Sequence, residues 1–161
     1  MGVALKDILE YDTIELSSIS NKKIAIDSFN MIYQFLASIR QADGTSLTDT
    51  KGNVTSHLKG LFNRCVYFKK NNIKAVFVFD GEAPKLKEAE RAIRAKKKAD
   101  AKIKYQAAID NDDLVEAKKH AQALNRLTPT MVKDSISLIE AFGFPVVQAP
   151  SEGEAQAGRL C

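Results

Sequence analysis

The sequence has no tryptophan, only two cysteines and two histidines, and no long apolar run. Cys65 and Cys161 cannot make a disulfide framework, so we expect an intracellular, reducing compartment. His57 and His120 have no cysteine or histidine partner at zinc-binding spacing, which argues against a zinc site. No apolar run approaches the roughly 20 residues of a membrane-spanning helix, so no membrane role is expected. Walker A and G-x-G-x-x-G motifs are also missing, which removes two common phosphate-binding loops.

Length and composition indicate one globular domain. The chain has 161 residues, of which 45% are hydrophobic and 27% charged, a balance that excludes a disordered chain. The net charge is +4, but it is unevenly distributed. Lys85 to Lys104 contains nine basic and three acidic residues, a local excess of +6 that leaves about −2 for the remainder. Such a segment indicates either a polyanion partner or a solvated helix face.

Strand and helix patterns alternate along most of the chain. Short β-rich runs predict strands over 22–26, 75–79 and 145–148, and apolar periodicity predicts helices over 31–39, 55–68 and 129–142. Thr55 or Ser56 is expected to cap the second of these helices, Thr128 the third, with Pro129 at its first position, and Ser151 a last one. This order predicts an α/β domain with a parallel sheet.

The segment 83–127 follows another pattern. It is rich in Ala, Lys, Glu and Gln, and residues 111–113 (Asn-Asp-Asp) interrupt it. We expect an αα-hairpin that stands off the main core.

Each predicted strand is followed by acidic residues. Asp27 follows the first, Asp80 the second, and Glu152 and Glu154 the third. Parallel strands present their carboxyl ends at one edge of the sheet, so these carboxylates are expected to gather there. Crowded carboxylates repel one another, and a hard cation such as Mg²⁺ or Mn²⁺ relieves that repulsion. The alternative is structural: an Asp after a strand commonly caps a helix, and a Glu in a first turn complements the helix dipole.

Four long stretches resemble the amino-terminal part of the flap endonucleases, the structure-specific 5′ nucleases, and most closely their archaeal members. The stretches are IAIDSFNMIYQFLASIRQ (24–41), TSHLKGLFNR (55–64), VFVFDGEAPKLK (76–87) and APSEGEAQA (149–157). The resemblance implies a truncated, PIN-like parallel-sheet nuclease core over 1–161, with a helical arch inserted at about 83–127. It also implies a Mg²⁺-dependent hydrolase that cuts branched, 5′-flap DNA in replication and repair, as endonuclease and exonuclease, inside the cell.

The resemblance assigns expected roles to individual residues. The expected metal ligands are Asp27, Asp80, Glu152 and Glu154. Two basic residues fall on positions close to the scissile phosphate and are expected to be catalytic: Lys87 and Arg94. The expected DNA contacts, Tyr33 among them through base stacking, are Gly2, Tyr33, Arg40, Arg64 and Glu152. From spacing and periodicity alone, Arg94 is interpreted as an ordinary solvent-exposed residue and Tyr33 as a residue at the edge of the core. Arg40 and Arg64 have the alternative of simple surface charges.

The chain departs from the family pattern after Ala157. Gly158 is expected to stop the last helix, and the family's further aspartates, helix-hairpin-helix platform and clamp-binding tail do not follow. We therefore expect weak or no nuclease activity, a sliding-clamp contact only through the missing tail, and self-association through an exposed sheet edge. Two alternatives stay open. One is a non-catalytic flap-binding module, and the other is an aspartate phosphatase, which Glu82 disfavours because that chemistry needs a second aspartate there.

Overall fold

The computed structural model describes residues 10–41, 44–82, 88–111, 113, 115–116 and 127–160. A short 3₁₀ turn over Leu16–Ile19 precedes the first strand. The strands are β1 (Lys23–Asp27), β2 (Lys74–Phe79) and β3 (Val146–Gln148). The helices are α1 (Ser28–Ser38), α2 (Ser56–Lys70), α3 (Glu88–Asp110), α5 (Pro129–Ala141) and α6 (Gly153–Leu160).

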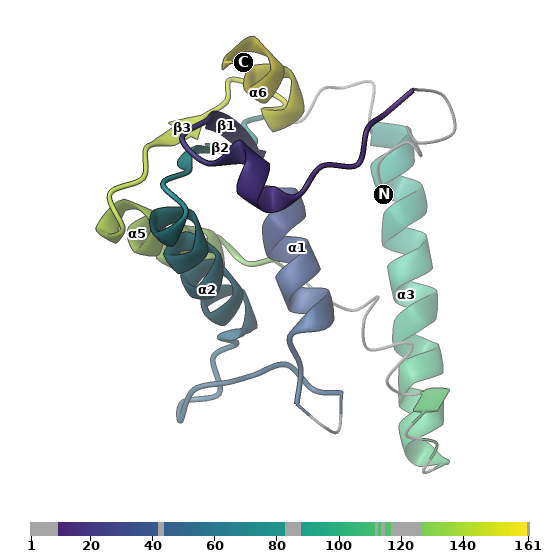
Figure 1. The fold of residues 1–161 in the computed structure, drawn as a ribbon. Coiled ribbons are helices and arrows are strands. Elements are labelled where there is room, and N and C mark those ends of the chain that lie inside the picture. The colour runs from purple at the N-terminus through teal and green to yellow at the C-terminus, as the bar shows by residue number, and fades with distance from the viewer. Residues whose placement is uncertain are drawn as a thin grey trace.

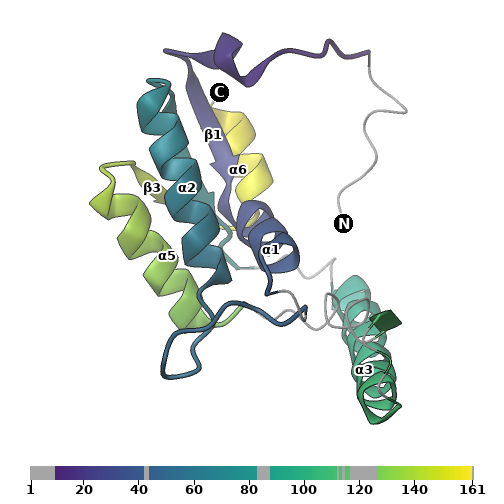
Figure 2. The same cartoon turned by 60° about the horizontal axis from the view of Figure 1, so that its bottom comes forward.

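The three strands form a parallel sheet in the order β1-β2-β3. Lys23 pairs with Lys74 and Asp27 with Val78, while Phe79 pairs with Gln148 at the other side of β2. Helices α1, α2 and α5 cover one face of this sheet, and α6 covers the other (Figures 1 and 2). The predicted α/β architecture with parallel strands is confirmed, and each predicted strand begins or ends within one residue of the observed one.

The hydrophobic core lies between the sheet and the layer of α1, α2 and α5. Its largest fully buried apolar side chains come from β2 and from each of these helices: Phe77, Phe79, Ile32, Leu36, Leu61 and Ile139. Phe68 of α2 and Phe144 before β3 meet the Phe77 ring at centroid distances of 6.3 and 5.7 Å. Burial of aromatic and branched side chains on this face determines which face of the sheet the helices α1, α2 and α5 cover, whereas the parallel direction of the strands brings their carboxyl ends together.

Local capping explains where helix α5 begins and ends, but not where α2 begins. The Thr128 hydroxyl accepts a hydrogen bond from the Met131 amide at 3.2 Å, and Pro129 occupies the first turn of α5, as the sequence predicts. Gly143 follows this helix with φ +71°, a conformation that glycine adopts without strain. The Thr55 side chain makes no cap at α2, and the Ser56 hydroxyl instead accepts from the Leu47 amide at 2.9 Å.

Two expectations for the last helix are wrong. Helix α6 continues through Gly158 to Leu160, because a single glycine lowers helix stability without ending a helix. Ser151 does not cap it; its hydroxyl donates to the Glu82 carbonyl oxygen at 3.1 Å. The first amide of α6 is satisfied from a different segment of the chain, the residue that follows β2.

Helix α3 is a single rod of 23 residues beside the sheet-and-helix body (Figure 1). Tyr105 of α3 lies close enough to Arg40 to affect the titration of its guanidinium. Ala101 and Ala108 are buried, which places them and Tyr105 on one helical face. The helix ends at Asp110, where the sequence predicts a break, while most of the second arm of the predicted hairpin lies outside the described residues. Within the described residues, no helix has the length and apolarity needed to cross a bilayer.

Candidate metal and nucleic-acid site

Asp27 and Asp80 lie at the carboxyl ends of neighbouring strands. Asp27 is the last residue of β1 and pairs with Val78 of β2, and Asp80 follows two residues later. Register partners project to the same face of a sheet, and so do residues two apart along a strand. Both aspartates therefore project to the face that α6 covers, at one edge of the sheet, as the sequence predicts.

Asp27 is the N-cap of α1. Its Oδ1 atom accepts a hydrogen bond from the Asn30 amide at 3.0 Å, and the residue is half-buried. Asp27 therefore performs the helix-capping role that was the structural alternative for an aspartate at the end of a strand. One carboxylate oxygen is held by the helix, and that contact fixes the direction of the other.

Asp80 performs the equivalent task for α6, although it belongs to a distant segment of the chain. Its Oδ1 atom accepts from the Gly153 amide at 2.7 Å, across 73 residues of sequence. Gly153 is buried, and a Cβ atom built on it would lie 2.6 Å from that oxygen. Only glycine at position 153 allows the start of α6 to approach Asp80 this closely.

Further hydrogen bonds fasten the end of β2 to the turn between β3 and α6. The Gly81 amide donates to the Ser151 carbonyl oxygen, and the Ala149 amide donates to the Phe79 carbonyl oxygen at 2.8 Å. The Gln148 side-chain amide donates to the Asp80 carbonyl oxygen. Because several hydrogen bonds join these two distant segments around Asp80, the position of its carboxylate is fixed by both of them.

Glu152 and Glu154 flank the glycine that contacts Asp80. Glu152 is half-buried and Glu154 is exposed in the first turn of α6. Both acidic residues therefore belong to the segment that the Gly153–Asp80 hydrogen bond holds against the strand ends. Negative charge at this edge is partly compensated by the amino ends of α1 and α6.

The donor set fits a hard divalent cation in its chemistry. Within the described ranges, no group of three or more His, Cys, Asp or Glu side chains is arranged to hold a metal ion. Mg²⁺, however, commonly binds through one or two carboxylates and fills the remaining positions with water and substrate phosphate. Asp27 and Asp80 supply two such carboxylates from neighbouring strands, each with one oxygen not engaged by the capping amide. The four-carboxylate site stays a prediction.

The expected DNA contacts within the body have different surroundings. Tyr33 on α1 is 46% exposed, so its ring is accessible to a base. Arg40 donates through its guanidinium to the Gly44 carbonyl oxygen at 2.7 Å and to the Ala37 carbonyl oxygen at 3.2 Å. Burial lowers the pKa of Arg40, and the nearby Tyr105 acts in the opposite direction. Arg64 on α2 lies over the Phe68 ring, 5.9 Å from its centroid.

Three of the expected residues cannot be placed with their side chains. Gly2 and Lys87 lie outside the described residues, and Arg94 is described only as part of the α3 backbone. Their expected roles therefore stay predictions.

The family model described as the XPG N-terminal domain matches residues 1–101 of this chain. The chain belongs to the XPG N-terminal domain family. Among its curated relatives, flap endonuclease 1 of Ignicoccus hospitalis is 51% identical over 164 residues, and flap endonuclease 1 of Pyrococcus furiosus is 47% identical over 160. Both alignments cover 99% of this chain and 47% of the relative. The chain thus spans about half the length of these relatives, and the resemblance carried by its motifs is confirmed.

Solved structures of similar proteins have the same fold. The flap endonuclease-1 of Methanococcus jannaschii matches with a TM-score of 0.70 and 43% identity, covering 99% of this chain and 50% of that one. The catalytic core of Rad2 in complex with DNA substrate matches with a TM-score of 0.61 and 30% identity. That match covers 91% of this chain and 37% of the Rad2 chain.

Sequence reasoning missed the residues that hold Asp80 in place. From the sequence, Gly153 is only a position between two acidic residues, and Gln148 is only the end of a predicted strand. A glycine between two glutamates at a helix start is a weak signal, because the close approach that requires it involves a segment 73 residues away. No local pattern reports such a contact.

Proposed function

We propose that this chain is the amino-terminal part of a metal-dependent, structure-specific 5′ nuclease that hydrolyses phosphodiester bonds in branched, 5′-flap DNA. The observation that supports it most is the placement of Asp27 and Asp80 at one sheet edge, each oriented by the amino end of a helix. The names of its relatives support the substrate class, since the two curated relatives that are 47% and 51% identical to this chain are flap endonucleases. The proposed metal is Mg²⁺, with Mn²⁺ as an alternative.

The residues have separate tasks in this proposal. Asp27 and Asp80 would hold the cation, and Glu152 and Glu154 would complete its negatively charged surroundings. The chemistry that such an ion would supply there is the activation of a water molecule and the stabilisation of negative charge on the phosphate. Lys87 and Arg94 bind the scissile phosphate and stabilise the charge that develops on it. The leaving group is the 3′-hydroxyl of the upstream nucleotide.

DNA binding is assigned to a wider surface. Tyr33 offers an exposed ring for stacking. Arg64 on α2 and Glu152 before α6 are further proposed DNA contacts. Arg40 also supports its own loop, since it donates hydrogen bonds to the carbonyl oxygens of Ala37 and Gly44. The basic segment that includes α3 attracts the phosphate backbone of the flap. Gly2 belongs to the same proposal as a contact at the amino terminus.

A cleavage and binding assay with Asp80→Asn tests the proposal. The amide keeps an oxygen that accepts from Gly153 but lacks the negative charge that a cation needs. We expect the weak Mg²⁺-dependent cleavage of a labelled 5′-flap duplex by the unmutated chain to disappear in this variant while flap affinity is retained. Detectable cleavage at equal rates by the unmutated chain and by Asp80→Asn contradicts the assignment of Asp80.

A non-catalytic flap-binding module is the second candidate. The finding in its favour is that the described residues assemble no group of three metal-binding side chains. Under this alternative the unmutated chain binds flap DNA but does not cleave it at any Mg²⁺ or Mn²⁺ concentration. The same assay therefore separates the two functions.

A further inference from the structure

Ser151 contacts a distant segment of the chain through a side chain that neither helix capping nor the proposed chemistry uses. A serine next to a helix start commonly caps that helix. Here the Asp80 carboxylate receives the first amide of α6, and the Ser151 hydroxyl is left for another contact. It donates to the Glu82 carbonyl oxygen at 3.1 Å, across 69 residues of sequence. This hydrogen bond therefore joins two segments and supports neither helix nor strand.

The backbone of Ser151 holds the same segment a second time. Its carbonyl oxygen accepts a hydrogen bond from the Gly81 amide, so one residue binds both positions that follow Asp80. The two segments are in backbone contact, because a Cβ atom built on Gly81 would overlap with the Ala149 carbonyl oxygen. Only glycine fits at this position. We call the two hydrogen bonds of Ser151 to this segment the Ser151 clasp.

The Ser151 clasp lies where the chain leaves the sheet for the basic helix α3. Glu82 is the last described residue before α3. On the other side of the clasp, Ser151 is followed by Glu152 and by Gly153, whose amide binds the Asp80 carboxylate. The clasp therefore joins the carboxylates of the proposed site to the segment that leads to its basic residues.

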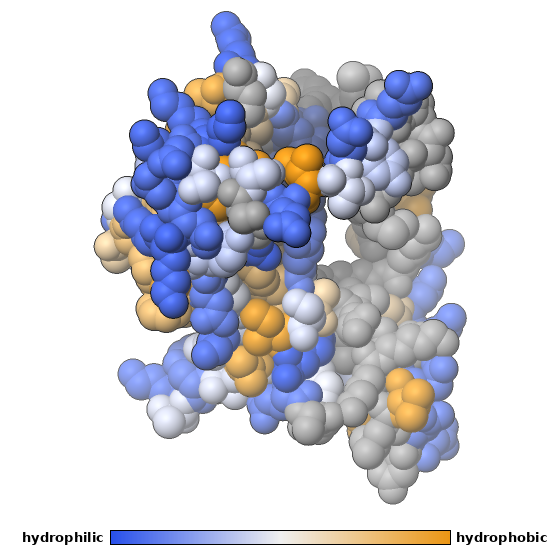
Figure 3. All heavy atoms as spheres, in the orientation of Figure 1, coloured by the Kyte–Doolittle hydropathy of each residue, from blue (hydrophilic) through white to orange (hydrophobic). Residues whose placement is uncertain are grey.

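Packing against the sheet-and-helix body does little to hold α3 in place. Among the described residues its contacts with the other helices and strands are sparse, apart from Tyr105 near Arg40. Its buried described side chains are two alanines, whereas Ile93, Ile103 and Ile109 are exposed. Figure 3 shows hydrophilic side chains along the outer margin of this helix. Because a helix with few buried apolar contacts is weakly held, the hydrogen bonds at the segment from which it leaves the body gain influence over its position.

We propose that Ser151 is a positioning residue for helix α3. Its clasp fixes the direction in which the chain leaves β2, and thereby the place of α3 relative to Asp80 and Glu152. The use of this placement rests on the proposed function, because the basic residues that follow Glu82 must then reach a phosphate beside the carboxylates. A helix that is already in place binds DNA without the cost of being ordered first.

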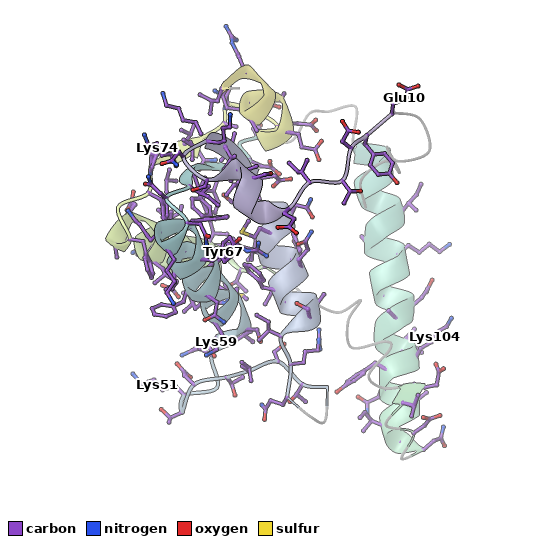
Figure 4. All side chains as sticks on the ribbon, viewed as in Figure 1. Glu10, Lys51, Lys59, Tyr67, Lys74 and Lys104 are labelled. Carbon is purple, nitrogen blue, oxygen red and sulfur yellow. The ribbon has the colours of Figure 1, made fainter. Side chains whose placement is uncertain are left out.

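The position of α3 is measured as the distance between two nitroxide labels by double electron–electron resonance. Lys59→Cys on α2 and Lys104→Cys on α3 carry the labels, since both lysines are exposed (Figure 4). Cys161→Ser removes one natural thiol, and Cys65 is fully buried and should not react with the label. We expect one main distance in this background. Ser151→Ala should raise the population outside that distance about fivefold, which is the effect of one lost hydrogen bond on a local equilibrium.

Two further variants separate positioning from a general loss of stability. Ser151→Thr keeps the hydroxyl and should keep the distance distribution of the background. Ser38→Ala removes another exposed hydroxyl, which donates to the Gln34 carbonyl oxygen at 2.7 Å within α1, and should also leave the distribution unchanged. The proposal is overturned if Ser151→Ala leaves the distribution unchanged, or if Ser38→Ala or Ser151→Thr broadens it equally. A background without a main distance overturns it as well.

This measurement contains neither DNA nor metal, so it decides on Ser151 independently of the nuclease proposal. A broader distribution in Ser151→Ala, together with no binding of flap DNA by the unmutated chain, would refute the proposed function and support the role of Ser151. An unchanged distribution in Ser151→Ala, together with Mg²⁺-dependent flap cleavage by the unmutated chain, would refute the role of Ser151 alone.

Discussion

Gly153 determines how closely α6 approaches the Asp80 carboxylate. In Gly153→Ala the new methyl group would lie 2.6 Å from Oδ1, so the helix start or the carboxylate must move. We expect a decrease of about 1–3 kcal/mol in the free energy of unfolding, measured in urea. Gly158→Ala is the matched control on the same helix, because nothing lies within 4 Å of its added Cβ. That variant should be more stable by about 0.5–1 kcal/mol, and a similar decrease in both variants contradicts the packing argument.

His57 is a buried group that no proposed function uses. It is 1% exposed, and neither ring nitrogen has a hydrogen-bond partner among the described residues. Burial lowers the pKa of His57, and the carboxylate of Asp134 on α5 acts in the opposite direction. Protonation therefore favours the unfolded chain, whose histidine has an ordinary pKa of about 6.5.

The stability that neutral His57 provides should depend on pH. It is complete above about pH 6.5 and decreases as the pH falls toward the lower pKa of the folded state, with a slope of up to about 1.4 kcal/mol per pH unit. Urea unfolding between pH 7.5 and 5 should show this slope in the unmutated chain and a smaller one in His57→Leu. Parallel profiles of the two proteins over this range would show that His57 does not titrate on unfolding.

Cys65 illustrates a residue for which the sequence was sufficient. Its position on the apolar face of α2 predicts core packing without an activating base, and it is fully buried in the structure. Burial raises the pKa of its thiol to about 11, and Lys69 acts in the opposite direction. The thiol is therefore protonated at neutral pH.

At the scale of the element, α1 allows the capping and metal-binding roles of Asp27 to be separated. Asp27→Ala removes the hydrogen bond to the Asn30 amide and should destabilise the protein by about 1 kcal/mol. Asp27→Asn keeps a side-chain oxygen for that amide, so its stability without metal should be close to that of the unmutated chain. The readout is thermal unfolding with and without Mg²⁺.

Addition of Mg²⁺ gives the second half of this experiment. A cation that binds the folded chain alone raises the unfolding midpoint. We expect that increase in the unmutated protein and not in Asp27→Asn. An equal increase in both proteins would show that the cation does not bind Asp27.

The boundaries of helices could be predicted wherever the two residues that form a capping or turn contact lie close together in the sequence. Thr128, Pro129 and Gly143 define α5 by caps and turns that involve neighbouring residues, and the strands follow from continuous apolar runs. The start of α6 could not be predicted, because its first amide is satisfied by Asp80 from a distant segment. The four acidic positions were identified from strand order, but their arrangement depends on this same non-local contact.

At the scale of the whole molecule, the uneven charge predicts a salt-dependent interaction with DNA. Lys96 and Lys104 lie exposed on α3, and Figure 4 shows Lys104 on the rod that stands beside the main body. Their joint replacement by Gln should weaken flap binding and reduce the slope of log K against log salt by about 0.7–0.9 for each phosphate that the variant no longer neutralises. Anisotropy titrations over a range of salt concentrations measure that slope. Lys133→Gln on α5 is the control and should leave the slope unchanged; an identical slope in all variants excludes α3 as a phosphate-binding element.

Pro145 at the entry to β3 has a consequence for the motion of the sheet, because proline has no amide hydrogen to donate to the Ala75 carbonyl oxygen. The first hydrogen bond between β2 and β3 is the one from the Phe77 amide to the Pro145 carbonyl oxygen. Thermal fraying of β3 can therefore break its hydrogen bonds with β2, but no new hydrogen bond can extend the pairing toward Ala75. The strand register is thus protected against slippage in that direction. Hydrogen exchange should therefore find the amide of Val147, which follows the first rung, protected, and rapid exchange of this amide would contradict the fixed register.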